Sequence, residues 1–193
     1  MFIRHVYGEE IHNYIVDIAA LRLEIFKDFP YLYDGNVEDE HKYLERYSLS
    51  KNSIVLLAFD DDDIVGASTA LPLQYADLGF KKPFENSSYN ISDIFYFGES
   101  VLLPQYRGNG IGNKFFQERE KFALSLGYDS FVFCAVNRGQ NHSLKPNNYR
   151  DLGKWWSRIG YQPMPYFVCN YSWKEVNSEK EVMNSLTFWQ KGL

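Results

Sequence analysis

The stretch "LLPQYRGNGIGNKFFQERE", residues 102–120, places Gly108, Gly110 and Gly112 between an apolar segment and a charged amphipathic one. Glycine leaves its backbone amide bare and adopts φ angles that other residues avoid. A strand, a glycine-rich turn and the start of a helix form an anion site, because unpaired N–H groups and the positive end of the helix dipole converge. The stretch therefore predicts that an anionic group binds close to the backbone.

Two common phosphate-binding loops do not fit this stretch. A P-loop needs two glycines that bracket four residues, followed by Lys and then Ser or Thr, and this arrangement is missing from the sequence. The dinucleotide-binding fingerprint needs a third glycine where this chain has Asn113, and an acidic residue where it has Val136 and Asn137. Each alternative lacks a required part.

The segment "QYRGNGIG", residues 105–112, resembles the pyrophosphate-binding signature of the GNAT acetyltransferases: Gln or Arg, two residues, Gly, one residue, then Gly or Ala. The preceding "ESVLLP" and the helix after the glycines are similar to the fourth strand and third helix of that family. A later segment ending in "RIGY" is similar to a family helix that ends in Gly and then Phe or Tyr. The resemblance covers residues 50–165 well and the N-terminal helices less closely.

The resemblance implies a binding mode for acetyl-CoA that needs no metal. The amides of residues 107–112 would hold the pyrophosphate, and the pantetheine arm would lie between splayed fourth and fifth strands, bonded to exposed main chain. The cofactor-binding residues it implies are Val101, Leu102, Leu103, Gln105, Arg107, Gly108, Asn109, Gly110, Ile111, Gly112, Asn113 and Asn137.

The implied reaction is direct transfer of an acetyl group from its thioester to an amine. An amine attacks only when neutral, so a base must accept its proton. Glu99 is the candidate, because it is the acidic residue of the predicted central strand. The alternative is that Glu99 is buried in an ion pair or faces solvent. A backbone amide near Leu102 would stabilise the developing oxyanion.

The proton donor for the departing thiolate is harder to assign. Relatives often carry a tyrosine four residues before the glycine that ends the later helix, and this sequence has Trp156 there. Tyr149 is the candidate that we retain, and Tyr161 is a second one. Packing in the core is the alternative for both aromatic rings.

The resemblance implies that the loop between the first two helices borders the acceptor site. There "PYLYDG" supplies Tyr31, Tyr33 and Asp34, and the polar excursion 74–92 adds aromatic residues, namely Tyr75, Phe84 and Tyr89. Aromatic walls with a carboxylate suit an amine with an apolar body. Aromatic rings that cap an edge of the core are the alternative.

Periodicity and turn residues predict the elements that position these groups. Strands are expected at 2–7, at "SIVLLAF" and "IVGASTALPL", at "DIFYFGESVLL" with a bulge or close approach at Gly98, and at "SFVFCAV", "YFVCNYSW" and "SLTFWQ". Helices are expected from "EEIHNYIVDIAALRLEIFKDF", ending before Pro30, and over 38–49, 110–126 and "YRDLGKWWSRIGY". We therefore expect an α/β fold with layered α and β elements: a GNAT fold whose mixed, largely antiparallel twisted sheet of about six or seven strands is flanked by about four helices.

The length and composition of the chain predict one globular domain over residues 1–193. The chain is 45% apolar and its net charge of −5 argues against nucleic acid as a partner. The N-terminus lacks the layout of a signal peptide and the apolar runs are too short to cross a bilayer, so we expect a cytoplasmic protein without a membrane partner. Cys134 and Cys169 are expected to be core thiols, and Asp60–Asp63 a solvated hairpin tip.

Within that domain, residues 8–50 would form two helices bordering the acceptor site. Residues 50–165 would form the core region that carries the family motif, and residues 166–193 the last strands. We expect an acetyl-CoA-dependent N-acetyltransferase that acts on an amine of a small molecule or a peptide. The alternative is a non-catalytic acyl-CoA-binding or sensing domain of the same fold. Aromatic residues of the C-terminal "LTFWQKGL", expected at a sheet edge, suggest a possible homodimer.

Overall fold

The computed structural model describes residues 1–139 and 141–192 of the chain. Over these residues the sheet has seven strands in the order β1-β2-β3-β4-β5-β7-β6. All neighbouring strands are antiparallel except β4 and β5, which are parallel. The predicted mixed, largely antiparallel sheet is confirmed. The strands are β1 (Phe2–Tyr7), β2 (Ile54–Asp60), β3 (Asp63–Pro72), β4 (Ile94–Leu102), β5 (Ser130–Val136), β6 (Gln162–Lys174) and β7 (Glu181–Lys191).

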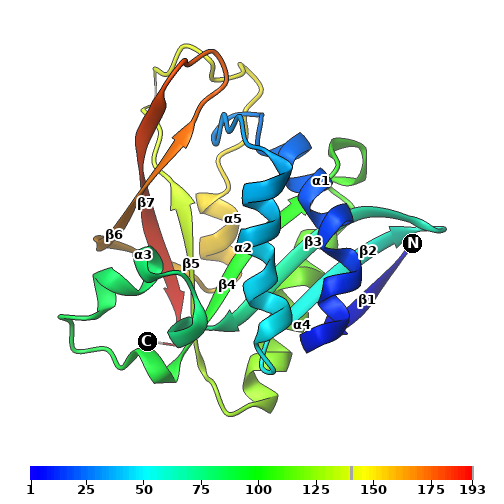
Figure 1. The fold of residues 1–193 in the computed structure, drawn as a ribbon. Helices are drawn as coiled ribbons and strands as arrows, with labels where there is room; N and C mark the ends of the chain where they lie inside the picture. The colour runs from blue at the N-terminus through cyan, green and yellow to red at the C-terminus, as the bar shows by residue number, and fades with distance from the viewer. Residues whose placement is uncertain (140, 193) are drawn as a thin grey trace.

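Helices cover both faces of this sheet. The first two, α1 (Ile15–Ile25) and α2 (Val37–Leu49), lie on one face, and α4 (Ile111–Ser125) and α5 (Gly153–Arg158) lie on the other (Figure 1). A short helix, α3 (Leu78–Lys81), interrupts the excursion between β3 and β4. No helix in the described part of the chain has both the length and the apolar character needed to cross a lipid bilayer.

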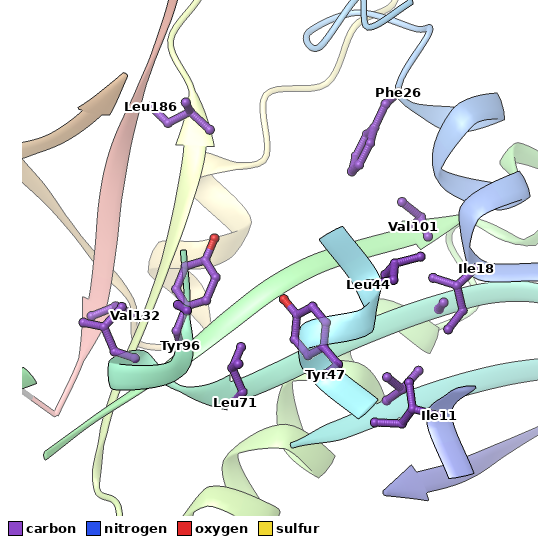
Figure 2. Close-up of a cluster of buried hydrophobic side chains, with 14 of the residues drawn as sticks. Ile11, Ile18, Phe26, Leu44, Tyr47, Leu71, Tyr96, Val101, Val132 and Leu186 are labelled. Carbon is purple, nitrogen blue, oxygen red and sulfur yellow. The ribbon is translucent and has the colours of Figure 1, made fainter. Parts of the chain in front are cut away.

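The sheet separates two apolar clusters. The cluster under α1 and α2 includes Ile18, Leu44, Tyr47 and Tyr96, and Figure 2 shows that its members come from helices and strands far apart in the sequence. The cluster under α4 and α5 is built mainly from aromatic rings, among them Phe97, Phe115 and Phe133. This double burial explains why β2, β3 and β4 read as nearly continuous apolar runs rather than as alternating ones.

A β-bulge distorts β4 at the predicted position. Ser68 pairs with Ser100 and Ala70 pairs with Phe97, so two steps along β3 match three steps along β4. Gly98 lies inside this bulge, and a Cβ atom there would approach the Thr69 and Tyr47 hydroxyl oxygens to 2.3 Å. Glycine is therefore required by close packing rather than by its φ angle.

Strands β4 and β5 separate soon after they meet. Their pairing joins Ile94–Tyr96 to Ser130–Val132, and beyond these residues β4 runs on to Leu102 while β5 follows β7. Figure 1 shows the two strands diverging. The predicted splay between them is confirmed, and it leaves an edge of β4 free where Glu99 and Leu102 lie.

Three predictions about the later elements were wrong. The helix α5 begins at Gly153, so Tyr149 lies in the preceding loop rather than in the helix. The strand β7 lies between β5 and β6, so the aromatic residues of "LTFWQKGL" are not at a sheet edge and the dimer argument based on them fails. The excursion 74–92 was expected to add aromatic rings to the acceptor site, but Tyr75 is exposed and Phe84 is buried in the core.

Candidate active site

The glycine loop, residues 107–113, connects the end of β4 to the first turn of α4. Gly108 and Gly110 have φ angles of +85° and +81°, and a Cβ atom at either position would meet nothing within 4 Å. Among the described residues, no oxygen accepts a hydrogen bond from the backbone N–H of Gly108, Asn109 or Gly110. The first amides of α4 also lack intrahelical partners by construction. The loop therefore presents a row of unpaired donors at the positive end of a helix.

Side chains close to the glycine loop support it from two directions. Arg107 donates from Nε to the carbonyl oxygen of Leu102 at 3.0 Å, so its guanidinium lies along the end of β4. Trp155 donates from Nε1 to Oδ1 of Asn113 at 2.7 Å, and its ring would lie 3.2 Å from a Cβ at Gly112. The indole thus forms a wall of the loop.

The register of β4 decides which of its backbone groups face the splay. Leu103 donates its amide to the carbonyl oxygen of Val65 at 3.0 Å, so it faces β3. Backbone groups alternate in direction along a strand, so Val101 also faces β3 and Leu102 faces the splay. The expectation that all three residues offer main chain to a ligand was wrong for Val101, which faces β3, and for Leu103, whose amide bonds to Val65 and whose carbonyl accepts from the amide of Tyr106 at 3.0 Å.

Asn137, expected to reach the same ligand, is engaged by β7. Its Nδ2 donates to Oγ of Ser185 at 3.1 Å and its Oδ1 accepts from Oγ1 of Thr187 at 3.0 Å. These bonds hold the end of β5 against β7. Gln105 is exposed in the turn after β4.

These features fit a pyrophosphate and its attached arm. Glycines at 108 and 110 leave the space above the loop open, and the unpaired amides supply donors without a cation. The free edge of β4 next to the loop can bond one extended chain. Within the described residues no cluster of His, Cys, Asp and Glu side chains could hold a metal ion.

An aromatic cavity of about 230 Å³ lies on the α1 and α2 side of the sheet, beside the splay. Its wall combines rings with carboxylates and a guanidinium. The lining residues are Arg22, Phe26, Tyr31, Tyr33, Asp39, Glu40, Tyr43, Asp77, Phe80, Tyr96, Gly98, Glu99, Cys134, Tyr171, Ser172, Trp173 and Leu186.

A buried ion cluster forms the polar floor of the aromatic cavity. Arg22 of α1 contacts Glu40 of α2 through Nε, and its Nη1 lies 2.8 Å from Oε2 of Glu99. The side chains of these three residues are 11%, 2% and 4% exposed. Burial of the guanidinium lowers the pKa of Arg22, but attraction by Glu99, Tyr43 and Glu40 outweighs this and raises it overall. Arg22 is therefore a permanent cation shared by two carboxylates.

The two oxygens of Glu99 differ in their surroundings. Oε2 accepts hydrogen bonds from Arg22 and from the hydroxyl of Tyr43, the latter at 2.9 Å. Oε1 is buried and has no partner among the described residues. An unpaired buried carboxylate oxygen is costly, and such atoms usually await a ligand or water. Glu99 lines the cavity, and among the described residues no donor competes with a ligand for Oε1.

The tyrosines of the cavity stay protonated. Burial, followed by the nearby charge of Glu99, raises the pKa of Tyr43. Burial also raises the pKa of Tyr96, whose hydroxyl lies 3.6 Å from Sγ of Cys134. Cys134 and Cys169 are free thiols, and Cys169 is buried.

The structure brings some of the predicted acceptor and acid residues to the cavity and leaves others out. Tyr31 and Tyr33 line it, but Asp34 does not, and its carboxylate pairs with Lys174 at 2.6 Å. Tyr149 packs edge-on against Phe29, with ring centroids 4.7 Å apart, and does not line the cavity.

Tyr161 and Trp156 belong to the other face of the sheet. Tyr161 is fully buried there and donates to Oε1 of Glu120 at 3.0 Å. Trp156 packs on Phe133 with centroids 4.9 Å apart. Tyr161 is a core residue, so the alternative of a packed aromatic holds for it, and Trp156 is a partly buried ring packed against the same cluster.

Sequence reasoning missed the partners of Glu99. Arg22 follows Ile18 by four residues, so it lies on the apolar stripe of α1, where an isolated charge would be unfavourable. That position was a signal that a buried carboxylate must lie nearby. Nothing in the sequence identified Glu40 or Tyr43 as that neighbourhood, because they come from a different helix.

Comparison with known proteins agrees with this geometry. The chain matches the model of the acetyltransferase (GNAT) family over residues 18–145. A search of curated proteins by sequence finds no match. The match begins inside α1, so it includes more of the N-terminal helices than the resemblance covered closely.

Several solved structures share the fold at low sequence identity. Ribosomal-protein-alanine N-acetyltransferase from Brucella melitensis has a TM-score of 0.62 at 15% identity, with 100% of both chains covered. A GNAT acetyltransferase from Streptococcus pneumoniae has a TM-score of 0.58 at 14% identity, covering 100% of this chain and 99% of that one. The yncA protein from Salmonella typhimurium, solved with its cofactor acetyl-CoA, has a TM-score of 0.58 at 11% identity, covering 99% of this chain and 94% of that one.

The glycine loop, the splayed strands and the family match over more than half of the sequence lead to one conclusion: the chain belongs to the GNAT family of acetyltransferases, which use acetyl-CoA.

Proposed function

We propose that this protein transfers an acetyl group from acetyl-CoA to the amine of a small molecule, with Glu99 as the base. The observation that carries the proposal is the unpaired Oε1 of Glu99, which is buried at the wall of a cavity beside the splayed part of β4. A base there lies between the free edge of β4 and the space for an acceptor.

The chain's own groups perform four tasks in this proposal. The amides of Gly108, Asn109 and Gly110, together with the first turn of α4, bind the pyrophosphate. The free edge of β4 at Leu102 would orient the arm, and the Leu102 N–H would be the donor for the acyl oxygen. When bound, acetyl-CoA would supply an acetyl group activated as a thioester. Breaking of the C–S bond would release coenzyme A as a thiolate, which takes up the second proton of the amine nitrogen.

The fourth task, removal of a proton from the acceptor amine, is performed by Glu99. An amine enters the cavity as an ammonium and must lose a proton before it attacks. Oε1 of Glu99 accepts that proton, while Arg22 and Tyr43 hold Oε2 and fix the orientation of the carboxylate. The aromatic walls keep water away from the reacting amine.

Substitution of Glu99 by Gln tests this proposal because Gln keeps the shape and removes the base. We expect kcat/KM to fall by about 10²- to 10⁴-fold, the range typical of general-base catalysis, with the affinity for coenzyme A unchanged. Thiol release from acetyl-CoA with a panel of amines measures the first quantity, and calorimetry measures the second. Asp34→Asn is the matched control, because Asp34 is a carboxylate near the cavity that does not line it.

The second candidate function, an acyl-CoA-binding domain without turnover, predicts the same glycine loop. It is favoured by Trp156, which stands at the position where relatives often have a tyrosine. Coenzyme A binding without thiol release across the whole panel would establish it in place of the transferase. Equal turnover by the parent and Glu99→Gln would instead retain the transferase and remove Glu99 from the mechanism.

A further inference from the structure

The aromatic cavity carries an excess of negative charge. Four carboxylates line it, from Asp39, Glu40, Asp77 and Glu99, against the single guanidinium of Arg22. Arg46 pairs with Asp77 at 3.3 Å and so offsets the charge of one of these carboxylates. A ligand that enters this cavity therefore meets a field that favours a cation and opposes an anion.

The cations around the cavity are already engaged. Arg22 is shared by Glu40 and Glu99, and Arg46 lies over the ring of Tyr43 as well as beside Asp77. Two further cations near the rim are also paired, namely Lys174 with Asp34 at 2.6 Å and Arg138 with Glu175 at 2.7 Å. In the part of the chain that the structure describes, none of these four is left to neutralise a carboxylate on the acceptor. An acidic acceptor would place its charge beside Glu40 and Glu99 without compensation.

The rings of the cavity suit an apolar body that carries a positive charge. Phe26 and Tyr43 already contact a cation, because the guanidinium carbon of Arg22 lies 4.9 Å and 4.3 Å from their ring centroids. Tyr31 stacks on Trp173 with centroids 6.1 Å apart, and Phe80 stacks on Tyr96 at 4.8 Å. Such faces bind organic cations and exclude water from aliphatic or aromatic groups.

The size of the cavity favours a compact acceptor. Its volume of about 230 Å³ lies below the range of roughly 300–1,000 Å³ typical of sites for drug-sized ligands. A compact amine matches this volume and would meet Glu99 at the wall of the cavity.

From these observations we propose that the acceptor is a compact primary amine with an aromatic or aliphatic body and no acidic group, selected by the Glu40–Arg22–Glu99 cluster and the surrounding rings. This inference rests on the proposed function for its consequence, acetylation, but it concerns binding and is tested by binding. It predicts that amino acids are rejected through their carboxylate and not through their side chain.

The test uses two matched series measured by calorimetry on the full chain, with coenzyme A present at saturation. The aromatic series is 2-phenylethylamine, phenylalaninamide, phenylalanine and 2-phenylethanol, and the aliphatic series is isopentylamine, leucinamide, leucine and isopentanol. We expect the amine and the amide of at least one series to bind, and the corresponding amino acid to bind at least about 100-fold more weakly than its amide, because burying like charges together costs several kcal/mol. The uncharged alcohol should bind at least about tenfold more weakly than the amine.

A variant pair links the selectivity to the cluster. Glu99→Gln should narrow the gap between amide and amino acid by about tenfold, because one of the opposing charges is removed. Asp34→Asn should leave the gap unchanged, because Asp34 lies outside the cavity and is neutralised by Lys174.

The outcomes separate this inference from the proposed function. Amino acids that bind as tightly as their amides, or a failure of every compound in both series to bind, would overturn the inference. Binding in the expected order without acetyl transfer would support the inference and refute the transferase. Acetylation of amino acids at the same rate as their amides would retain the transferase and refute the selectivity.

Discussion

The glycine loop and the aromatic cavity both border β4, yet they are built from different materials. The loop uses main-chain groups of consecutive residues, and its shape depends on φ angles at Gly108 and Gly110. The cavity uses side chains from α1, α2, α3 and strands β4 to β7, brought together by the fold. A site made of backbone depends on local conformation, whereas a site made of side chains depends on buried charge and packing.

The largest expected effect is on stability and concerns the cavity: Arg22→Met should lower the free energy of unfolding. Removal of one partner from a buried ion cluster typically costs about 3–5 kcal/mol, because Glu40 and Glu99 would be left without a cation. Urea denaturation monitored by circular dichroism measures the loss.

Arg119→Met is the matched control for that substitution. Arg119 is also buried, but on the α4 side of the sheet, where it donates to the carbonyl oxygens of Phe115 and Thr69 at 3.2 Å each and lies over aromatic rings. Burial, only partly offset by Tyr161 and Glu99, lowers its pKa to about 10, so its charge is disfavoured there. We expect Arg119→Met to cost less than Arg22→Met, and an equal cost would show that the carboxylates do not set the difference.

An intermediate effect is expected in the glycine loop, where stability and ligand affinity can be separated. A valine at position 110 would have to adopt φ near +81°, which costs about 1–3 kcal/mol of backbone strain, and its side chain would fill the open space above the amides. Gly110→Val should therefore weaken coenzyme A binding at least about tenfold in calorimetry.

Gly127 provides the control for Gly110, because it also has a positive φ, +87°, with nothing within 4 Å of its Cβ position, and it follows the opposite end of α4. Gly127→Val should lose similar stability without losing affinity for coenzyme A. Equal loss of affinity in both variants would mean that strain in α4, and not the loop itself, controls binding.

The smallest expected effect is a pH dependence of the cavity. Tyr43 has a raised pKa in the folded protein because of its burial and the charge of Glu99. Below pH 10 it is protonated in both the folded and unfolded states, so its contribution to stability is fully present. Above pH 10 the unfolded chain loses the proton first, so stability falls by up to about 1.4 kcal/mol per pH unit for this residue.

Denaturation of the parent and of Tyr43→Phe at pH 8, 10 and 11 measures this contribution. The variant should lose about 1 kcal/mol less than the parent between pH 10 and 11. Identical slopes would indicate that the Tyr43 hydroxyl is open to solvent and that the cavity is less closed than its geometry implies.

The same contrast explains what the sequence could predict. The positions of the strands along the chain and of the glycine loop follow from local patterns, since periodicity and glycine spacing are properties of neighbouring residues. The splay between β4 and β5 was expected only from the family resemblance. Phe2–Tyr7 was predicted with the bounds that the structure gives β1. The bulge at Gly98 followed from a glycine inside an otherwise apolar strand.

The cavity could be predicted only in part. Tyr31 and Tyr33 were identified from their loop, but the pairing of Asp34 with Lys174 joins residues 140 positions apart, and no local pattern reveals it. The same holds for Arg22 and Glu40. The strand β7 was predicted to be present, yet its insertion between β5 and β6 depends on the pairing of the whole sheet.

The unpaired amides of the glycine loop also bear on how sequences of this family diverge. Every amino acid except proline carries the same backbone donor, so a position such as Asn109 can change its side chain and still present an N–H group. Selection then needs to preserve only the few glycines that shape the turn. The structural relatives share the fold of this chain at 9–15% identity. A site made of main chain is the part of such a fold that tolerates a change of side chain.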